Sequence, residues 1–391
     1  MTYLSDELRS ELAARAVTPF DAARMLPLEM YRSPAVLAAE HATVLGSGWH
    51  CLGRTADIAG VGDYITGELP HLHSDGTPGN RSVLVVRGDD NQVRAFDNVC
   101  VHRGAPLVAG CGTEARFTCP YHAWVYRLDG QLIGAPYMQR PDSGEAFDPA
   151  PHRLGELSVE VWEGFIFVNA RPAPAPLAHQ LSGLTDVVAP FQMAGYVPVH
   201  QQVDEWATNW KLLVENFMDT YHVFKVHRAT FGATSDSPLN TTMFPGTEAW
   251  AHHVATERDD VAHPSNTSLE GPWRRAVVLA AVFPTHVMQL QPDYLWYLQI
   301  SPVGTDRVRI RWDVSVAPEM LAAQPDPAAY VASIVELLTA VNAEDQPIVE
   351  SIRRAADGPE FRRAPLSMYE RNVFDFDRYI AVKIAAVDSM A

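Results

Sequence analysis

Three of the chain's four cysteines lie in one short stretch, "CVHRGAPLVAGCGTEARFTCPYH", which runs from residue 100 to residue 122. Its ends read Cys100-x-His102 and Cys119-x-x-His122, so each end offers one sulfur and one nitrogen ligand. Two such mixed pairs can bind one metal centre only if the fold brings the two ends of the stretch together. The stretch therefore predicts a small metal-binding module, and the rest of the chain must fold around it.

Three kinds of site use these residue types: a disulfide, a zinc knuckle and an iron–sulfur cluster. The N-terminus "MTYLSDELRSELAARAV" lacks the basic start and apolar core of a signal peptide, so we expect a cytoplasmic protein with reduced thiols. Zinc fingers usually pair Cys with Cys and His with His. In a Rieske [2Fe–2S] centre two cysteines hold one iron and two histidines hold the other, so mixed pairs favour this cluster over zinc.

The stretch resembles the Rieske motif C-x-H-x(16)-C-x-x-H of ring-hydroxylating oxygenases. Respiratory Rieske proteins carry an additional cysteine in each ligand loop, whereas this chain has Ala105 and Tyr121 at the matching positions. The oxygenase branch is therefore favoured. This chain also has Ala123 where family members usually have glycine. The other two cysteines, Cys51 and Cys111, are expected to be small buried side chains.

Length and charge limit the class of protein. With 391 residues, of which 47% are hydrophobic, the chain can bury the cores of two domains. Its formal charge is −17 (30 basic minus 47 acidic residues) and it has no long basic cluster, so we expect neither nucleic acid nor an anionic membrane as a partner. It has no apolar run long enough for a transmembrane helix.

The order of predicted elements indicates an α+β protein. Residues 5–16 and 34–44 are expected to be helical, and short apolar strands with turn signals follow over residues 48 to about 155. The proline-rich "RPAPAPLAHQL" marks the return to a second domain, where strands are predicted in segments such as "DYLWYLQISPV" and "DRVRIRWDVSVAP". Two further helices are predicted, at roughly 207–224 and 328–356.

A second group of metal-binding residue types lies in "NWKLLVENFMDTYHVFKVHRATFG", residues 209–232. At about 100° per residue, Glu215, Asp219 and His222 would share one helix face, whereas His227 would point away from it. Both histidines can reach one metal only if the helix distorts or ends between them. Gly232 is available to terminate the helix.

The pattern E-x3-D-x2-H-x4-H resembles the mononuclear iron motif of Rieske oxygenases. The resemblance implies that His222 and His227 bind Fe(II) with a carboxylate from a later helix, and "VNAEDQPIVESI" aligns Asp345 with that ligand position. Two imidazoles and one carboxylate leave coordination positions open for oxygen. The acidic residues near Asp345 are expected to be ordinary solvated residues on a helix face: Glu344, Glu350 and Asp357.

Asp219 has a different role in the resemblance. It matches the carboxylate that bridges a Rieske histidine of one subunit and an iron-ligating histidine of the next, which orients both rings and shortens the path of the electron. Carnitine monooxygenases of this fold have glutamate at that position. The other histidines, among them His252, His253, His263 and His286, match no motif and are expected to be ordinary side chains.

The resemblance extends over nearly the whole chain. In length and in its C-terminal helix the chain is similar to the branch that contains choline and betaine monooxygenases, and aromatic-ring members share most of these features. The resemblance implies a Rieske all-β domain inserted into a catalytic domain with a curved antiparallel sheet and flanking helices. We expect residues 1–47 to be the N-terminal part of the catalytic domain, 48–155 the Rieske domain, and 156–391 the catalytic iron domain. It also implies a head-to-tail homotrimer.

The implied activity is O2-dependent hydroxylation or N/O-demethylation of a small organic substrate, for which a quaternary ammonium compound is one candidate. The chain has no G-x-G-x-x-G fingerprint, so electrons from NAD(P)H must arrive through a separate reductase or ferredoxin. The alternatives are an aromatic-ring dioxygenase of the same family, a Rieske electron carrier and a zinc hydrolase. Seven residues could form the substrate pocket by caging a cation or holding a ring: Phe244, Trp250, Phe283, Met288, Tyr294, Trp296 and Trp312.

Overall fold

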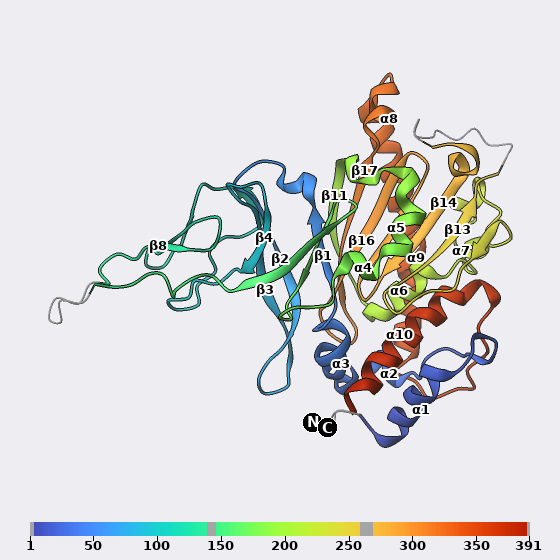
Figure 1. Ribbon diagram of the computed structural model, residues 1–391. Coiled ribbons are helices and arrows are strands. Elements are labelled where there is room, and N and C mark those ends of the chain that lie inside the picture. The colour runs from blue at the N-terminus through green and yellow to red at the C-terminus, as the bar shows by residue number, and fades with distance from the viewer. Residues whose placement is uncertain (1–3, 139–145, 259–268, 389–391) are drawn as a thin grey trace. The chain divides into compact units, whose positions relative to one another are not determined.

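The structure is a computed structural model that describes residues 4–138, 146–258 and 269–388 (Figure 1). Residue contacts divide the chain into two compact units. The smaller unit is Trp49–Ala178, and the larger combines Met1–Gly48 with His179–Ala391. The smaller unit is thus an insertion in the sequence of the larger one, as the sequence predicts. No helix in the described ranges is both long and apolar enough to cross a bilayer.

The smaller unit consists of two antiparallel sheets. Seven strands form one sheet in the order β1-β10-β9-β4-β3-β2-β5, and three short strands form the other in the order β6-β7-β8. The strands are β1 (His50–Arg54), β2 (Asp63–Leu72), β3 (Pro78–Arg87), β4 (Val93–Asp97), β5 (Cys111–Thr113), β6 (Phe117–Thr118), β7 (Val125–Tyr126), β8 (Leu132–Gly134), β9 (Glu156–Trp162) and β10 (Phe165–Asn169). Both predicted metal-binding ends lie in loops beside this small sheet.

The boundary between the units differs from the one expected after residue 155. Strand β9 pairs with β4, and β10 pairs with both β9 and β1, so residues 156–169 complete the sheet of the smaller unit. Contacts change from one unit to the other between Ala178 and His179, within the proline-rich segment and within the short helix α4 (Leu177–Gln180). Strand pairing, which the sequence does not reveal directly, decides the boundary.

The larger unit contains a seven-stranded antiparallel sheet in the order β11-β17-β16-β15-β14-β13-β12. The strands are β11 (Val197–Trp206), β12 (Thr241–Met243), β13 (Trp250–Thr256), β14 (Ala276–Val282), β15 (His286–Leu290), β16 (Tyr294–Pro302) and β17 (Val308–Val316). The strands from β13 to β17 follow one another as neighbours, and β11 closes the edge beside β17. This is the curved antiparallel sheet that the resemblance implies.

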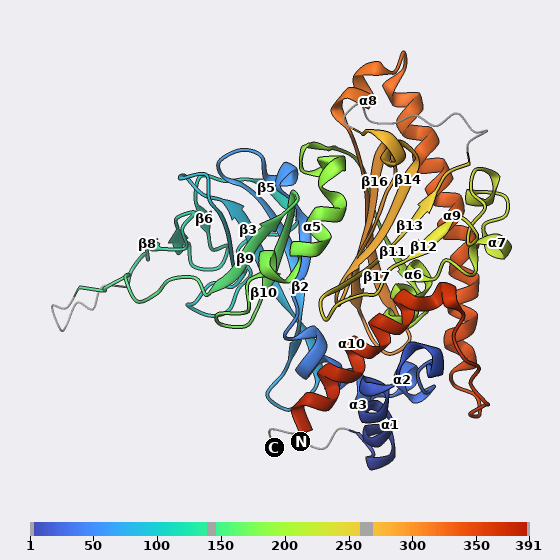
Figure 2. The same ribbon diagram turned by 45° about the vertical axis from the view of Figure 1, so that its right-hand side comes forward.

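Helices α6, α9 and α10 pack against this sheet, and α9 runs alongside it in Figure 2. The helices of this unit are α1 (Asp6–Val17), α2 (Glu29–Arg32), α3 (Pro34–Glu40), α5 (Ser182–Val188), α6 (Trp210–Met218), α7 (Val223–Val226), α8 (Pro318–Ala323), α9 (Pro327–Ala355) and α10 (Arg371–Asp388). The bounds of α1 and α9 agree closely with the helices predicted at 5–16 and 328–356. A π-helical turn, His41–Leu45, continues α3 to the end of the helix predicted at 34–44.

The helix predicted over residues 207–224 is much shorter than expected. Asn209 caps the start of α6 by accepting a hydrogen bond from the Lys211 amide, and Asp219 has an extended backbone at the other end. The prediction that Asp219 and His222 share one helix face is therefore wrong. The Asp219 carboxylate accepts a hydrogen bond from the Tyr221 amide at 2.7 Å, which stabilises the turn after α6.

Candidate metal centre and substrate cavity

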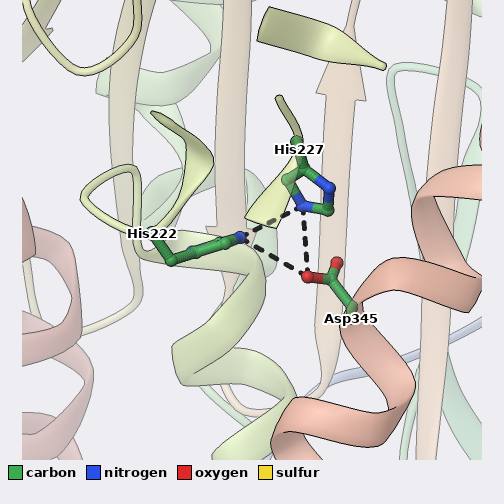
Figure 3. A group of neighbouring side chains, drawn as sticks. All are labelled: His222, His227 and Asp345. Carbon is green, nitrogen blue, oxygen red and sulfur yellow. Dashed lines mark hydrogen bonds and ion pairs between the residues drawn. The ribbon is translucent and has the colours of Figure 1, made fainter. Parts of the chain in front are cut away.

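His222, His227 and Asp345 come together at one point in the larger unit (Figure 3). His222 precedes the single-turn helix α7 and His227 follows it, while Asp345 projects from α9. The Nε2 atoms of the two histidines are 3.1 Å apart, and Asp345 Oδ1 lies 3.5 Å from His222 Nε2 and 3.1 Å from His227 Nε2. The interrupted helix thus brings both histidines to one side, as the sequence required.

The outer nitrogen of each ring contacts a carboxylate. His222 Nδ1 lies 3.2 Å from Asp219 Oδ2, and His227 Nδ1 lies 2.8 Å from Glu344 Oε2. Because a carboxylate only accepts hydrogen bonds, each Nδ1 must carry the proton and donate. In the neutral rings, both Nε2 atoms then lack a proton. Their lone pairs face each other and the lone pairs of Asp345 Oδ1. Three such atoms at contact distance repel one another unless a cation lies between them.

The charges of these groups agree with that conclusion. Burial lowers the pKa of His222, but its hydrogen bonds to Asp219 and Asp345 outweigh burial and raise this pKa to about 10. Burial raises the pKa of Asp345, but the hydrogen bonds to the two histidines lower it to about 2. A proton therefore binds strongly here, and a metal cation would replace it, since the site stabilises positive charge.

Glu344 also accepts a hydrogen bond from the Thr230 hydroxyl at 2.7 Å, so two groups hold its carboxylate beside His227. From the sequence we expected Glu344 to be a solvated residue, because no sequence pattern distinguishes it from the other glutamates of α9. Its neighbour Glu350 instead accepts a hydrogen bond from the Ala207 amide, and Glu215 accepts one from the Tyr31 hydroxyl. Neither Glu350 nor Glu215 belongs to the group of His222, His227 and Asp345 at the candidate metal centre.

In the smaller unit the two predicted ligand loops have similar hydrogen bonds. The Cys100 amide donates to Ala105 O and the Gly104 amide donates to Cys100 O; likewise the Cys119 amide donates to Trp124 O and the Ala123 amide to Cys119 O. Gly104 has φ = +79° and Ala123 has φ = +56°, so both loops turn through the left-handed region. Ala123 adopts there a conformation that glycine adopts at lower cost.

The four predicted cluster ligands lie at the ends of these loops. The rings of His102 and His122 are 4.7 Å apart, and Cys100 and Cys119 are buried free thiols. Among the described residues, buried His102 Nδ1 has no hydrogen-bond partner. Cys100 Sγ lies 3.3 Å from the Tyr126 hydroxyl. Of the other two cysteines, Cys51 is buried as expected, but Cys111 is exposed in the edge strand β5, which corrects that expectation.

A cavity adjoins the metal centre of the larger unit. Its lining includes Asp219, His222, His227 and Asp345, together with residues of β13, β14, β15 and β16. Of the seven residues expected to form a substrate pocket, Trp296 alone is among those that line this cavity in the described ranges. Phe217 lies beside it with a ring separation of 5.3 Å. The cavity thus has an aromatic wall, although six of the seven candidates lie outside its lining.

Several of those candidates have structural contacts elsewhere. Phe244 stacks on His252 at 4.6 Å, the Trp250 indole donates to Gln180 O, and the Trp312 indole donates to Asp204. His253, which no motif distinguished, does line the cavity. His263 lies outside the described residues. Which side of a strand faces the cavity depends on its register in the sheet, so these assignments could not come from residue type alone.

Comparison with known proteins agrees with both halves of this arrangement. Residues 49–159 match the family described as the Rieske [2Fe-2S] domain, and residues 193–386 match the catalytic domain of the ring hydroxylating alpha subunit. The chain belongs to the Rieske-type ring-hydroxylating oxygenases. It is therefore an iron-dependent oxidoreductase with a Rieske [2Fe–2S] cluster and a mononuclear iron.

Among curated relatives of this oxygenase, a glycine betaine monooxygenase oxygenase subunit from Chromohalobacter salexigens is 36% identical over 204 residues. That alignment covers 52% of this chain and 43% of the relative, so the chain spans less than half of it. A carnitine monooxygenase oxygenase subunit from Acinetobacter baumannii is 27% identical over 356 residues, which are 88% of each chain.

Two solved structures show how widely the fold is shared. A quaternary ammonium Rieske monooxygenase superposes with a TM-score of 0.79 at 22% identity over 97% of this chain and 98% of that chain. A naphthalene 1,2-dioxygenase from Rhodococcus sp. superposes with a TM-score of 0.78 at 19% identity over 98% of this chain and 99% of that one. The shared fold therefore does not distinguish the two kinds of substrate.

Proposed function

We propose that this oxygenase hydroxylates or N-demethylates a quaternary ammonium compound at an iron held by His222, His227 and Asp345. The observation that carries the iron assignment is the convergence of one ligand atom each from His222, His227 and Asp345, with a carboxylate at Nδ1 of each histidine. Such outer contacts set the tautomer and orientation of metal-binding histidines. The curated relatives that act on glycine betaine and carnitine support the substrate class.

The same proposal assigns Cys100, His102, Cys119 and His122 to the [2Fe–2S] cluster. Two buried free thiols are suited to bind metal, as is the buried His102 Nδ1, which has no hydrogen-bond partner in the described part of the chain. The cluster supplies an electron for oxygen activation when it is bound. The residues of this chain hold it, and the Tyr126 hydroxyl is positioned to donate to a ligating sulfur.

Asp219 is the proposed bridge for electron transfer between subunits. Its Oδ2 accepts from His222 and its Oδ1 accepts from the Tyr221 amide, so the carboxylate is oriented from within its own subunit. About a fifth of its side chain is exposed, which leaves it accessible to a histidine of a second copy. A homotrimer with head-to-tail contacts would supply such a histidine, and a separate reductase or ferredoxin would supply electrons from NAD(P)H.

The substrate class is tested by anaerobic binding to protein that carries the reduced cluster and Fe(II). Choline, carnitine and glycine betaine are added separately, and the magnetic circular dichroism of the mononuclear Fe(II) is recorded. Naphthalene and indole serve as the contrasting aromatic panel. A change in the Fe(II) signal with a quaternary ammonium compound, and none with the aromatic compounds, is the expected result. A response to the aromatic panel alone would refute the proposed substrate class.

A further inference from the structure

One wall of the cavity is a row of residues that crosses four neighbouring strands, β13 to β16. His253 pairs with Leu279, Leu279 pairs with Gln289, and Gln289 pairs with Trp296. All four line the cavity. Since residues that are opposite one another in a sheet point to the same side, His253 belongs to the same wall as Trp296.

The tautomer of His253 is determined by its contacts. Its Nδ1 lies 3.0 Å from Asn372 Oδ1, and Asn372 Nδ2 donates to Phe244 O at 3.1 Å. A backbone carbonyl only accepts, so the amide nitrogen of Asn372 must face Phe244 and its oxygen must face His253. His253 Nδ1 therefore carries a proton and donates it to Asn372. In the neutral ring, Nε2 is left as a hydrogen-bond acceptor.

His253 is neutral at ordinary pH because it is buried. It is 1% exposed, and burial lowers its pKa to about 4 despite the opposing hydrogen bond to Asn372. Among the described residues, the hydrogen bond of His253 uses Nδ1, and Nε2 is not one of the buried polar atoms that lack a partner. Because His253 lines the cavity, its Nε2 lone pair is open to a donor from a ligand.

We propose that His253 Nε2 accepts a hydrogen bond from the substrate, and that the cavity therefore selects a quaternary ammonium compound that bears a hydroxyl group. This inference rests on the proposed function for the ammonium part of the substrate. Phe217, Phe231 and Trp296 line the same cavity and supply the aromatic rings that such a cation can contact. No lysine or arginine is among the described lining residues, so a substrate carboxylate beside His253 would meet an acceptor and no cation.

The adjacent His252 provides a matched control. Successive residues of a strand point to opposite sides of the sheet, and His252 is absent from the cavity lining in the described chain. Its ring stacks on Phe244 at 4.6 Å. Burial lowers its pKa to about 4 as well. The two histidines thus share a strand, a buried environment and a neutral charge, but only His253 lines the substrate cavity.

The test compares choline with propyltrimethylammonium, in which a methyl group replaces the hydroxyl. Binding to anaerobic protein with its cluster and Fe(II) is measured by isothermal titration calorimetry at pH 7.5. Wild-type protein is expected to bind choline roughly tenfold more tightly. His253→Phe should bind the two probes with similar affinity, whereas His252→Phe should retain the preference. The visible spectrum of the cluster reports that each variant is folded.

Asn372→Asp gives an independent measurement if His253→Phe does not fold. Aspartate still accepts from Nδ1 but favours the imidazolium ring, in which Nε2 carries a proton and no longer accepts. The preference for choline should then weaken at neutral pH and return as the pH rises. Equal affinity of wild-type protein for both probes, or a preference that survives in His253→Phe, would overturn this inference and leave the proposed function intact. Binding of neither probe would overturn the proposed substrate class and this inference with it.

Discussion

The Nε2 atoms of His222 and His227 face each other at 3.1 Å, and each ring donates from Nδ1 to a different carboxylate. Asp219 contacts one ring and Glu344 the other, so these two carboxylates determine that the Nε2 atoms, and not the Nδ1 atoms, face Asp345 and the proposed iron. Because Asp219 follows α6 and Glu344 lies on α9, the orientation of the two rings depends on how those helices pack.

Replacing Glu344 with glutamine should weaken iron binding. The amide is nearly isosteric but uncharged, so His227 loses a charge-assisted hydrogen bond and becomes a weaker ligand. The expected loss is about 10–100-fold in Fe(II) affinity, measured by equilibrium titration of the protein with its cluster intact. Glu336→Gln makes the same charge change at an exposed position of α9 and should leave the affinity unchanged. Unaltered affinity in Glu344→Gln would contradict the role given to that carboxylate.

Asp219→Asn should separate electron transfer from metal binding. The amide keeps the size but loses charge and its capacity to accept on both sides, so each histidine partner loses a hydrogen bond of about 1.5–3 kcal/mol. His222 becomes a weaker ligand, as His227 does in Glu344→Gln, but both metals should remain bound at saturating Fe(II), while oxidation of the cluster slows by orders of magnitude. The measurement follows cluster oxidation after oxygen is added to fully reduced, substrate-loaded protein. Wild-type rates would refute the bridging role, and loss of the mononuclear iron would make Asp219 a support for the metal site.

Tyr126→Phe should lower the reduction potential of the cluster. The Tyr126 hydroxyl lies 3.3 Å from Cys100 Sγ, and a hydrogen bond to a ligating sulfur stabilises the reduced, more negative cluster. Taking about 1 kcal/mol for this differential interaction, we expect a decrease of roughly 40 mV in a redox titration. Tyr137→Phe removes a fully exposed hydroxyl in the same unit and should leave the potential unchanged. An equal potential in Tyr126→Phe would show that the hydroxyl does not donate to the cluster.

Acid should destabilise the fold partly through His252. Its folded-state pKa is lowered to about 4 by burial, below the ordinary value of 6.5, so the unfolded chain binds a proton that the folded chain excludes. The stability that neutral His252 contributes is present above pH 6.5 and is lost as the pH falls toward 4, by up to roughly 3 kcal/mol. In urea unfolding, His252→Gln should flatten the dependence of stability on pH across this window. As a control, His179→Gln at an exposed position should leave the dependence of stability on pH unchanged. An unchanged dependence in His252→Gln would contradict the contribution given to His252.

The two metal motifs could be predicted because most of their ligands are close in sequence. Cys100 with His102 and Cys119 with His122 form local pairs whose spacing carries chemical meaning. Asp345 has no such neighbour, and resemblance to a family identified it. The spacing of His222 and His227 predicted a helix that distorts or ends between them, whereas α6 ends at Met218, before both histidines.

Other features could not be predicted because they depend on contacts between distant parts of the chain. Glu344 is 117 residues from His227, and His253 is 119 residues from Asn372. Whether a strand residue faces the cavity depends on sheet register, which is why Trp296 lines it and Trp312 does not. The expected domain boundary failed for the same reason, since β9 and β10 join their sheet through pairing that the sequence does not display.

One chain should bind both a cluster and a separate mononuclear iron, the iron through His222, His227 and Asp345. The most direct test is the iron and acid-labile sulfide content of Asp345→Ala and wild-type protein after anaerobic reconstitution. A [2Fe–2S] cluster plus one mononuclear iron predicts three irons and two sulfides per wild-type chain. Asp345→Ala should contain two irons and two sulfides, with the visible spectrum of the cluster unchanged. Three irons in Asp345→Ala, or two in the wild-type chain, would contradict this assignment.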